Sequence, residues 1–164
     1  MNNLILLLII FVLIIISIQD IKSRLISVYA VLFLTILSFL YWFLNSKNLS
    51  FLIYSIGFLF LNLISLKAYT IITKKEKTED LIYGLGLGDI LFFIVIIPLF
   101  STFNYILYFI SGLIVSIIIH GIVSFFNKEK LIPLAGYLSV YLILFLTFIY
   151  LTDKNNYIDL FYIN

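Results

Sequence analysis

Long apolar runs alternate with short polar connections along the chain. Six apolar segments are expected to form helices, and they cover residues 4–18, 25–44, 51–72, 87–100, 105–126 and 131–151. A helix that crosses a bilayer needs about 20 residues, so the first and fourth segments are short unless residues 17–20 and 84–89 are counted inside them or lie in a recess at membrane depth. The pattern predicts an all-α integral membrane protein with six transmembrane helices, and a single polytopic domain over residues 1–164.

The composition supports this prediction. The chain has 164 residues, of which 64% are hydrophobic and 11% are charged, whereas about 25% of the residues in a soluble domain are charged. The chain contains no cysteine, which excludes disulfides and thiolate metal sites. A net charge of +2 is too small to indicate a nucleic-acid partner. We therefore expect a lipid bilayer as the environment, with no metal and no cofactor.

The positive charges are distributed unevenly along the chain. Most of the ten Lys and Arg residues lie in the connections 19–24, 73–83 and 127–130. Because Lys and Arg gather on the cytoplasmic side of membranes, these connections are expected to face the cytoplasm and both termini to lie outside, in the cell inner (cytoplasmic) membrane. Asp20, Asp89 and the stretch 132–136 then fall on the same, cytoplasmic face.

Two of the carboxylates on this face flank apolar segments. Asp89 follows a glycine-rich stretch and precedes an apolar run, and Asp20 follows the first apolar segment. Carboxylates at membrane depth are costly and indicate function. Two that lie close together share one proton, so one can act as a base on water and the other as an acid toward a scissile carbonyl. Ion or proton transport stays open, as does a simple interfacial role for Asp20 beside Lys22 and Arg24.

Further residues on this face are candidates for binding a substrate. Gly86 and Gly88 leave room for an extended peptide backbone to pass close to Asp89. Pro133 fits the first turn of the last helix, and Gly136 permits close backbone approach there. Arg24 is a candidate for contact with substrate, although an anchor on the cytoplasmic side is an equally good interpretation of its charge.

Three stretches of the sequence resemble motifs of the type IV prepilin peptidases, including the preflagellin peptidases. The sequence GLGD at residues 86–89 is similar to the GxGD motif of intramembrane aspartic proteases. The sequence DIKSRLISV at residues 20–28 matches D-x-x-x-R-x-I-P-N at its Asp, Arg and Ile, and IPLAGYLS at residues 132–139 resembles I-P-F-G-P-F-L-A. The resemblance implies a six-span peptidase domain in which Asp20 and Asp89 are catalytic. It also implies an aspartic endopeptidase that removes the short cytoplasmic leader of a prepilin-like substrate.

The chain departs from the family pattern at several positions. Leu91 stands where the family often has Lys, and Ser27 and Val28 stand where the first motif has Pro and Asn. The cysteine-containing insert that larger members carry, which is linked to N-methylation, is missing, so cleavage alone is expected. These departures keep an alternative open, namely a non-catalytic six-span membrane protein that is either a small transporter or an inactive peptidase relative acting in assembly.

Overall fold

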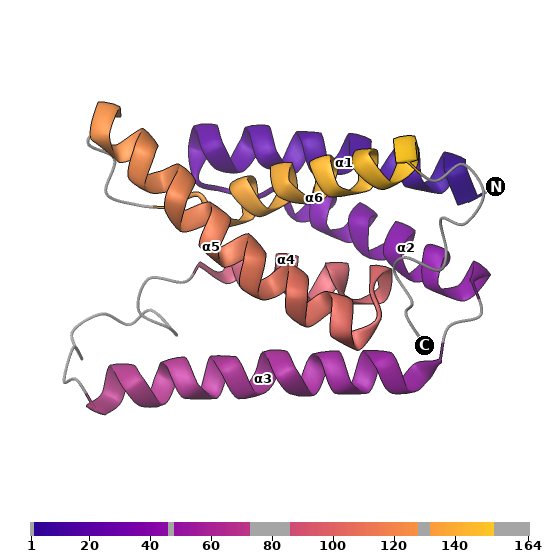
Figure 1. The fold of residues 1–164 in the computed structure, drawn as a ribbon, viewed down its shortest axis with the longest axis horizontal. Coiled ribbons are helices and arrows are strands. Elements are labelled where there is room, and N and C mark those ends of the chain that lie inside the picture. The colour runs from indigo at the N-terminus through magenta and orange to yellow at the C-terminus, as the bar shows by residue number, and fades with distance from the viewer. Residues whose placement is uncertain (1, 46–47, 73–85, 128–131, 153–164) are drawn as a thin grey trace.

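Helices make up all the regular structure of the described residues (Figure 1). The computed structural model describes residues 2–45, 48–72, 86–127 and 132–152. Its helices are α1 (Asn2–Ser23), α2 (Val28–Leu44), α3 (Leu49–Ile72), α4 (Leu87–Ile96), the 3-10 helix η1 (Ile97–Leu99), α5 (Thr102–Asn127) and α6 (Leu134–Thr152). One α-helix corresponds to each predicted apolar segment, which confirms the all-α prediction. By length and composition, α1, α3 and α5 can cross a membrane, whereas the apolar stretches of the other helices are shorter.

The first helix is longer than the sequence pattern predicts. α1 continues through Asp20 to Ser23, so the prediction of a connection at residues 19–24 is wrong for residues 19–23, because polar residues at a helix end do not stop the helix. The helix ends at Ser23, and Arg24 after it has the left-handed backbone conformation (φ 57°) that is common just after a helix. α1 therefore includes residues 17–20, the condition under which the first segment reaches a spanning length.

The fourth helix is short and is followed by a 3-10 turn that contains a proline. Its ten residues rise about 15 Å at 1.5 Å per residue, which is half of the ~30 Å hydrocarbon core of a bilayer. Pro98 lacks an amide hydrogen and lies in the 3-10 turn η1 that follows. In this turn the amide of Ile97 donates to the carbonyl of Ile94, and the carbonyl of Phe93 accepts a hydrogen bond from the Tyr105 hydroxyl at 3.2 Å.

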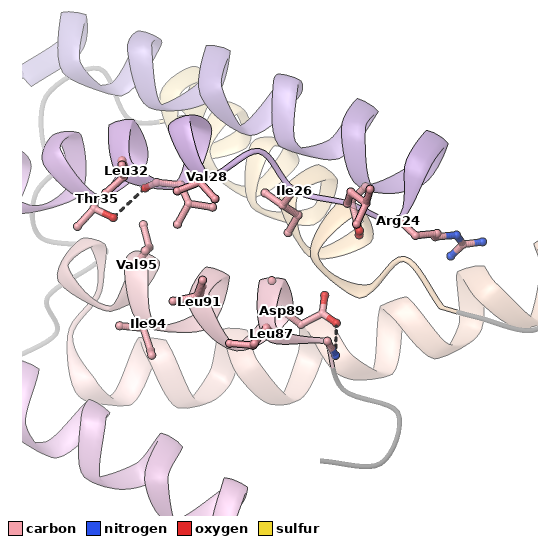
Figure 2. A pocket seen from close by; sticks show the side chains of 15 residues that line it. Arg24, Ile26, Val28, Leu32, Thr35, Leu87, Asp89, Leu91, Ile94 and Val95 are labelled. Carbon is pink, nitrogen blue, oxygen red and sulfur yellow. Dashed lines mark hydrogen bonds between the residues drawn. The ribbon is translucent and has the colours of Figure 1, made fainter. Parts of the chain in front are cut away.

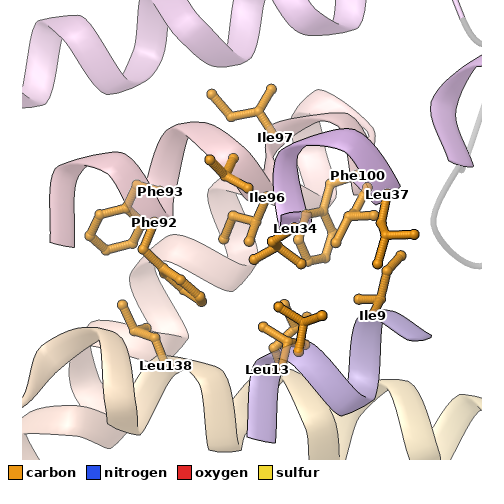
Figure 3. Close-up of a cluster of buried hydrophobic side chains, with 14 of the residues drawn as sticks. Ile9, Leu13, Leu34, Leu37, Phe92, Phe93, Ile96, Ile97, Phe100 and Leu138 are labelled. Carbon is orange, nitrogen blue, oxygen red and sulfur yellow. The ribbon is translucent and has the colours of Figure 1, made fainter. Parts of the chain in front are cut away.

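The apolar core joins all six α-helices and η1. α1 packs against α6 and α2, while α4 packs against α2 and α6. Buried side chains from these elements gather in one cluster (Figure 3), and its most buried members include Ile9, Leu13, Leu34, Phe92, Ile96 and Leu138. The cluster fixes the ends of α1, α4 and α6 relative to one another, and the predicted site residues lie at these ends.

Large apolar side chains also cover the outside of the molecule. Exposed Leu, Ile, Val and Phe residues are found on all six α-helices. α3 lies at one side of the molecule (Figure 1), where it contacts α5, η1 and α4. Soluble proteins rarely expose apolar surface on this scale, so this surface is typical of a protein that faces lipid.

Candidate active site

Asp20 occupies a core position of α1. A buried stripe runs along this helix at the spacing of one helical face, and it consists of Ile5, Ile9, Leu13, Ile16 and Asp20. Asp20 is only 5% exposed. A carboxylate that continues an apolar stripe is buried by the same packing as its neighbours, so it requires hydrogen-bond donors from the elements that cover it.

Asp89 lies in the first turn of α4 and is held by the glycine that precedes the helix. The amide of Gly86 donates to Asp89 Oδ2 at 3.1 Å, and the amide of Asp89 donates back to the Gly86 carbonyl at 3.1 Å. This is the return half of a capping box, in which a side chain at the third helical position satisfies a free amide before the helix. The carboxylate is thereby fixed at the start of α4.

The N-terminal turn of α6 binds both carboxylates. The amide of Ala135 donates to Asp89 Oδ1 at 2.9 Å, and the amide of Gly136 donates to Asp20 Oδ2 at 2.6 Å. Amides in the first turn of a helix have no acceptor within the helix, and the helix dipole favours negative charge there. Two consecutive amides of one helix thus bring together aspartates that are far apart in the sequence.

The charges around the two aspartates interact. Asp20 and Asp89 are close enough for the charge of Asp20 to act on Asp89, and the charge of Arg24 acts on Asp20. Two like charges at one helix end favour the sharing of a proton between the carboxyl groups. Among the described residues, no three His, Cys, Asp or Glu side chains are grouped so that they could hold a metal ion.

Gly136 permits the close approach of α6 to α1. A Cβ atom at Gly136 would lie 2.9 Å from Ile21 Cγ1 and 3.1 Å from Asp20 Oδ2, distances at which a neighbouring atom has to move. Pro133 is buried just before α6, and its carbonyl accepts the amide of Tyr137 at 3.0 Å. The structure therefore places Gly136 against Asp20, whereas contact of Pro133 or Gly136 with a substrate stays a prediction.

The space beside the two glycines of the GLGD stretch is partly filled by the protein itself. A Cβ at Gly88 would lie 3.0 Å from Ile26 Cδ1, and a Cβ at Gly86 would lie 3.2 Å from Asp89 Oδ2. Gly88 thus lets the connection before α2 cross over the start of α4. Contact of either glycine with a substrate stays a prediction, and Gly84 lies outside the described residues.

Arg24 lies beside the aspartates in a strained conformation. Its left-handed φ of 57° is uncommon for a residue other than glycine, asparagine or aspartate. Figure 2 shows its guanidinium directed away from Asp89. The basic residues of the predicted cytoplasmic connections 73–83 and 127–130 lie outside the described residues.

A groove opens from the aspartates between α2 and α4 (Figure 2). Its volume is about 690 Å³, and its lining includes Asp20, Asp89 and Arg24 together with apolar residues of both helices. We call it the α2–α4 groove, with walls from residues 28–35 of α2 and 87–95 of α4. Leu91, which departs from the family pattern, is part of this lining.

Sequence reasoning missed three parts of the site. The Ala135 amide binds Asp89 as a backbone donor, so no side-chain pattern could have identified it. Ile26 fills the space beside Gly88, and nothing in the sequence pairs these two residues. The third missed part is the apolar lining of the α2–α4 groove. Leu91, which stands where the resemblance implies a lysine, could have indicated this apolar lining.

Comparison with known protein families gives a match over most of the chain. A sequence model of the type IV leader peptidase family matches residues 7–124, which include both aspartates and the GLGD stretch and end before α6. No curated protein and no solved structure matches the chain significantly. The match covers well over half of the sequence and confirms the resemblance to prepilin peptidases. The chain therefore belongs to the type IV leader peptidase family.

Proposed function

We propose that the chain is a membrane-embedded aspartic endopeptidase that removes the short cytoplasmic leader of prepilin-like proteins. The observation that carries this proposal is the pair of hydrogen bonds from consecutive α6 amides to Asp20 and Asp89. In this proposal residues 1–164 form a single polytopic peptidase domain of six spans in the inner membrane. The site faces the cytoplasm, and both termini lie outside.

The two carboxyl groups supply the acid and the base of the reaction. One is ionised and takes a proton from a water molecule while the water oxygen attacks the carbonyl carbon of the scissile bond. The other is protonated and gives its proton to the carbonyl oxygen. The tetrahedral diol then collapses: the leaving nitrogen receives a proton from the pair, the C–N bond breaks, and one diol hydroxyl returns its proton to the pair. The shared proton belongs to Asp20 and Asp89 jointly.

The α6 amides give this pair a fixed geometry. Each amide binds one oxygen, Oδ2 of Asp20 and Oδ1 of Asp89, and the positive end of the α6 dipole favours the single negative charge of the pair. We assign substrate contacts to Arg24, Gly86, Gly88, Pro133 and Gly136, since each lies within a few residues of a carboxylate or of the α6 amides that bind the carboxylates.

A second function is favoured by one specific observation. Asp89 satisfies the free amides of Gly86 and Ala135, and Asp20 satisfies that of Gly136. Carboxylates in these positions stabilise helix starts in proteins with no catalytic activity. The alternative is therefore a non-catalytic relative in which both aspartates are structural caps.

Asparagine substitution separates the two functions. Asn keeps one oxygen acceptor in place of each carboxylate but cannot exchange a proton, so Asp20→Asn and Asp89→Asn should each abolish leader removal while the protein still folds. Asp89→Asn also loses one of the two hydrogen bonds that Asp89 accepts, so it should lower stability more than Asp20→Asn does. Cleavage is measured on a co-expressed pilin-like protein that carries an intact leader. The readout is the decrease in the mass of that protein when the leader is removed. Asp153→Asn, at a carboxylate outside the described residues, is the matched control and should cleave at the wild-type rate.

The outcomes are distinct for each function. Cleavage by the wild-type chain that persists in both Asn variants would exclude the aspartic mechanism. Loss of cleavage together with loss of folded protein in detergent would favour structural caps. A wild-type chain that cleaves no leader-bearing substrate would favour the non-catalytic alternative.

A further inference from the structure

The α2–α4 groove begins at the two aspartates and continues between apolar walls. Its volume of about 690 Å³ lies within the range of about 300–1,000 Å³ that is typical of ligand pockets. Figure 2 shows Val28 and Leu32 of α2 on one side of this space and Leu91 and Val95 of α4 on the other. The groove is therefore a site with two apolar walls and one charged end.

The apolar walls remain accessible to a ligand. Leu32 is 55% exposed and Leu91 is 42% exposed, although the core packs directly behind α4. The hydroxyl of Thr35, at the far end of the groove, already donates to the Val31 carbonyl at 2.8 Å. The polar groups that face a ligand are thus concentrated at the aspartate end, and the rest of the groove matches an apolar ligand.

Continuity with the aspartates favours a peptide over other apolar ligands. Asp20 and Asp89 are part of the groove lining. If these carboxylates hold a peptide bond of the substrate, the substrate residues on one side of that bond therefore lie at the mouth of the groove. Under the proposed function, the residues before this bond are a polar leader and those after it are apolar. Polar residues would lose their hydration against the apolar walls, whereas apolar residues gain from burial there.

We infer that the α2–α4 groove binds the apolar residues that directly follow the scissile bond of the substrate. This inference rests on the proposed function, and it specifies where the substrate residues after the scissile bond bind. Leu32 and Leu91 contact these residues from opposite walls, and Leu91 determines that this part of the site accepts apolar side chains.

Narrowing the groove tests the inference by kinetics. Leu32→Trp and Leu91→Trp should each raise KM about tenfold with little change in kcat, because they exclude apolar groups whose burial supplies binding free energy. The substrate is a synthetic peptide with a charged leader and an apolar segment, in detergent. Ile36→Trp on α2 and Ile114→Trp on α5 are matched controls, because both residues are exposed and lie outside the groove lining. Unchanged KM in both groove variants would overturn the inference.

Photo-crosslinking identifies the occupant directly. A benzoylphenylalanine introduced at position 32 or 91, in a chain that also carries Asp89→Asn, should crosslink to the substrate residues just after the cleavage site. The same probe at position 36 or 114 should crosslink only to lipid in vesicles. Crosslinks to lipid alone at positions 32 and 91, or to the leader instead of the apolar segment, would contradict the inference.

These results can be told apart from failure of the proposed function. If the wild-type chain cleaves the peptide but the groove variants keep their KM and crosslink only to lipid, the proposed function holds and the groove assignment is wrong. If the wild-type chain cleaves no peptide, the proposed function itself is wrong.

Discussion

Gly136 determines how closely α6 can approach Asp20, and the consequence of enlarging it can be estimated from the structure. In Gly136→Ala the new Cβ would lie 2.9 Å from Ile21 Cγ1, 3.1 Å from Asp20 Oδ2 and 3.3 Å from Asp20 Cβ. These contacts force α6 and α1 apart at the point where the Gly136 amide binds Asp20 at 2.6 Å. Packing strain of this kind costs about 1–3 kcal/mol.

The expected effect on catalysis follows from the weakened hydrogen bond. A hydrogen bond to a charged group contributes about 1.5–3 kcal/mol, and each 1.36 kcal/mol changes a rate about tenfold. We therefore expect Gly136→Ala to lower kcat by about 10- to 100-fold. KM should rise less than kcat falls, because Gly136 lies outside the lining of the α2–α4 groove.

The assay is leader removal from a synthetic peptide by purified protein, with kcat and KM from initial rates and the thermal midpoint measured in the same detergent. Gly57→Ala and Gly121→Ala are controls, because a Cβ at either glycine would have no neighbour within 4 Å. Both should keep full activity. A folded Gly136→Ala protein with wild-type kcat would refute the reasoning.

A second substitution distinguishes steric strain from general instability. Ile21→Ala removes the atom nearest to the new Cβ, and Ile21 is exposed enough for this change to cost little stability. The double variant should therefore recover part of the lost kcat. No recovery, together with a low thermal midpoint, would mean that the loss arises from unfolding rather than from the position of Asp20.

Two further predictions concern stability. Arg24→Gly should raise the thermal midpoint, because glycine relieves the left-handed strain at φ 57°, which is worth about 1–2 kcal/mol. It should also raise KM, whereas an unchanged KM would indicate that Arg24 is only a topology anchor. Tyr108→Phe should lower the free energy of unfolding by about 1 kcal/mol, because it removes the buried hydrogen bond of 2.8 Å to the Leu138 carbonyl. Tyr141→Phe, whose bond to Ser111 is less buried, should cost less, and denaturation in detergent is the measurement for both.

The helices and the identity of the aspartates could be predicted from local properties of the sequence. Each apolar run is long enough to favour a helix, and Asp20 and Asp89 stand out because carboxylates next to such runs are rare. The exact end of α1 could not be predicted in this way. It depends on Arg24, whose left-handed conformation is set by the connection to α2 rather than by its own preference.

The geometry of the site depends on tertiary packing that sequence patterns do not encode. The glycines of the GLGD stretch indicate close approach, but the residue that approaches Gly88 is Ile26 of the same chain. The donors to the carboxylates are backbone amides at Ala135 and Gly136, which every non-proline residue possesses. Only the packing of α6 against α1 and α4 selects these two.

The two α6 amides belong to adjacent residues of one rigid helix, and this has a mechanical consequence. A shift of α6 along its axis lengthens the hydrogen bonds to Asp20 and Asp89 together, so the two carboxylates gain or lose their support as one unit. Perturbations far along α6, for example at Leu138 or Leu142, can then affect both aspartates through the same axial shift of the helix. The activity of the pair would report the axial position of a helix that contributes no acidic side chain of its own to the site.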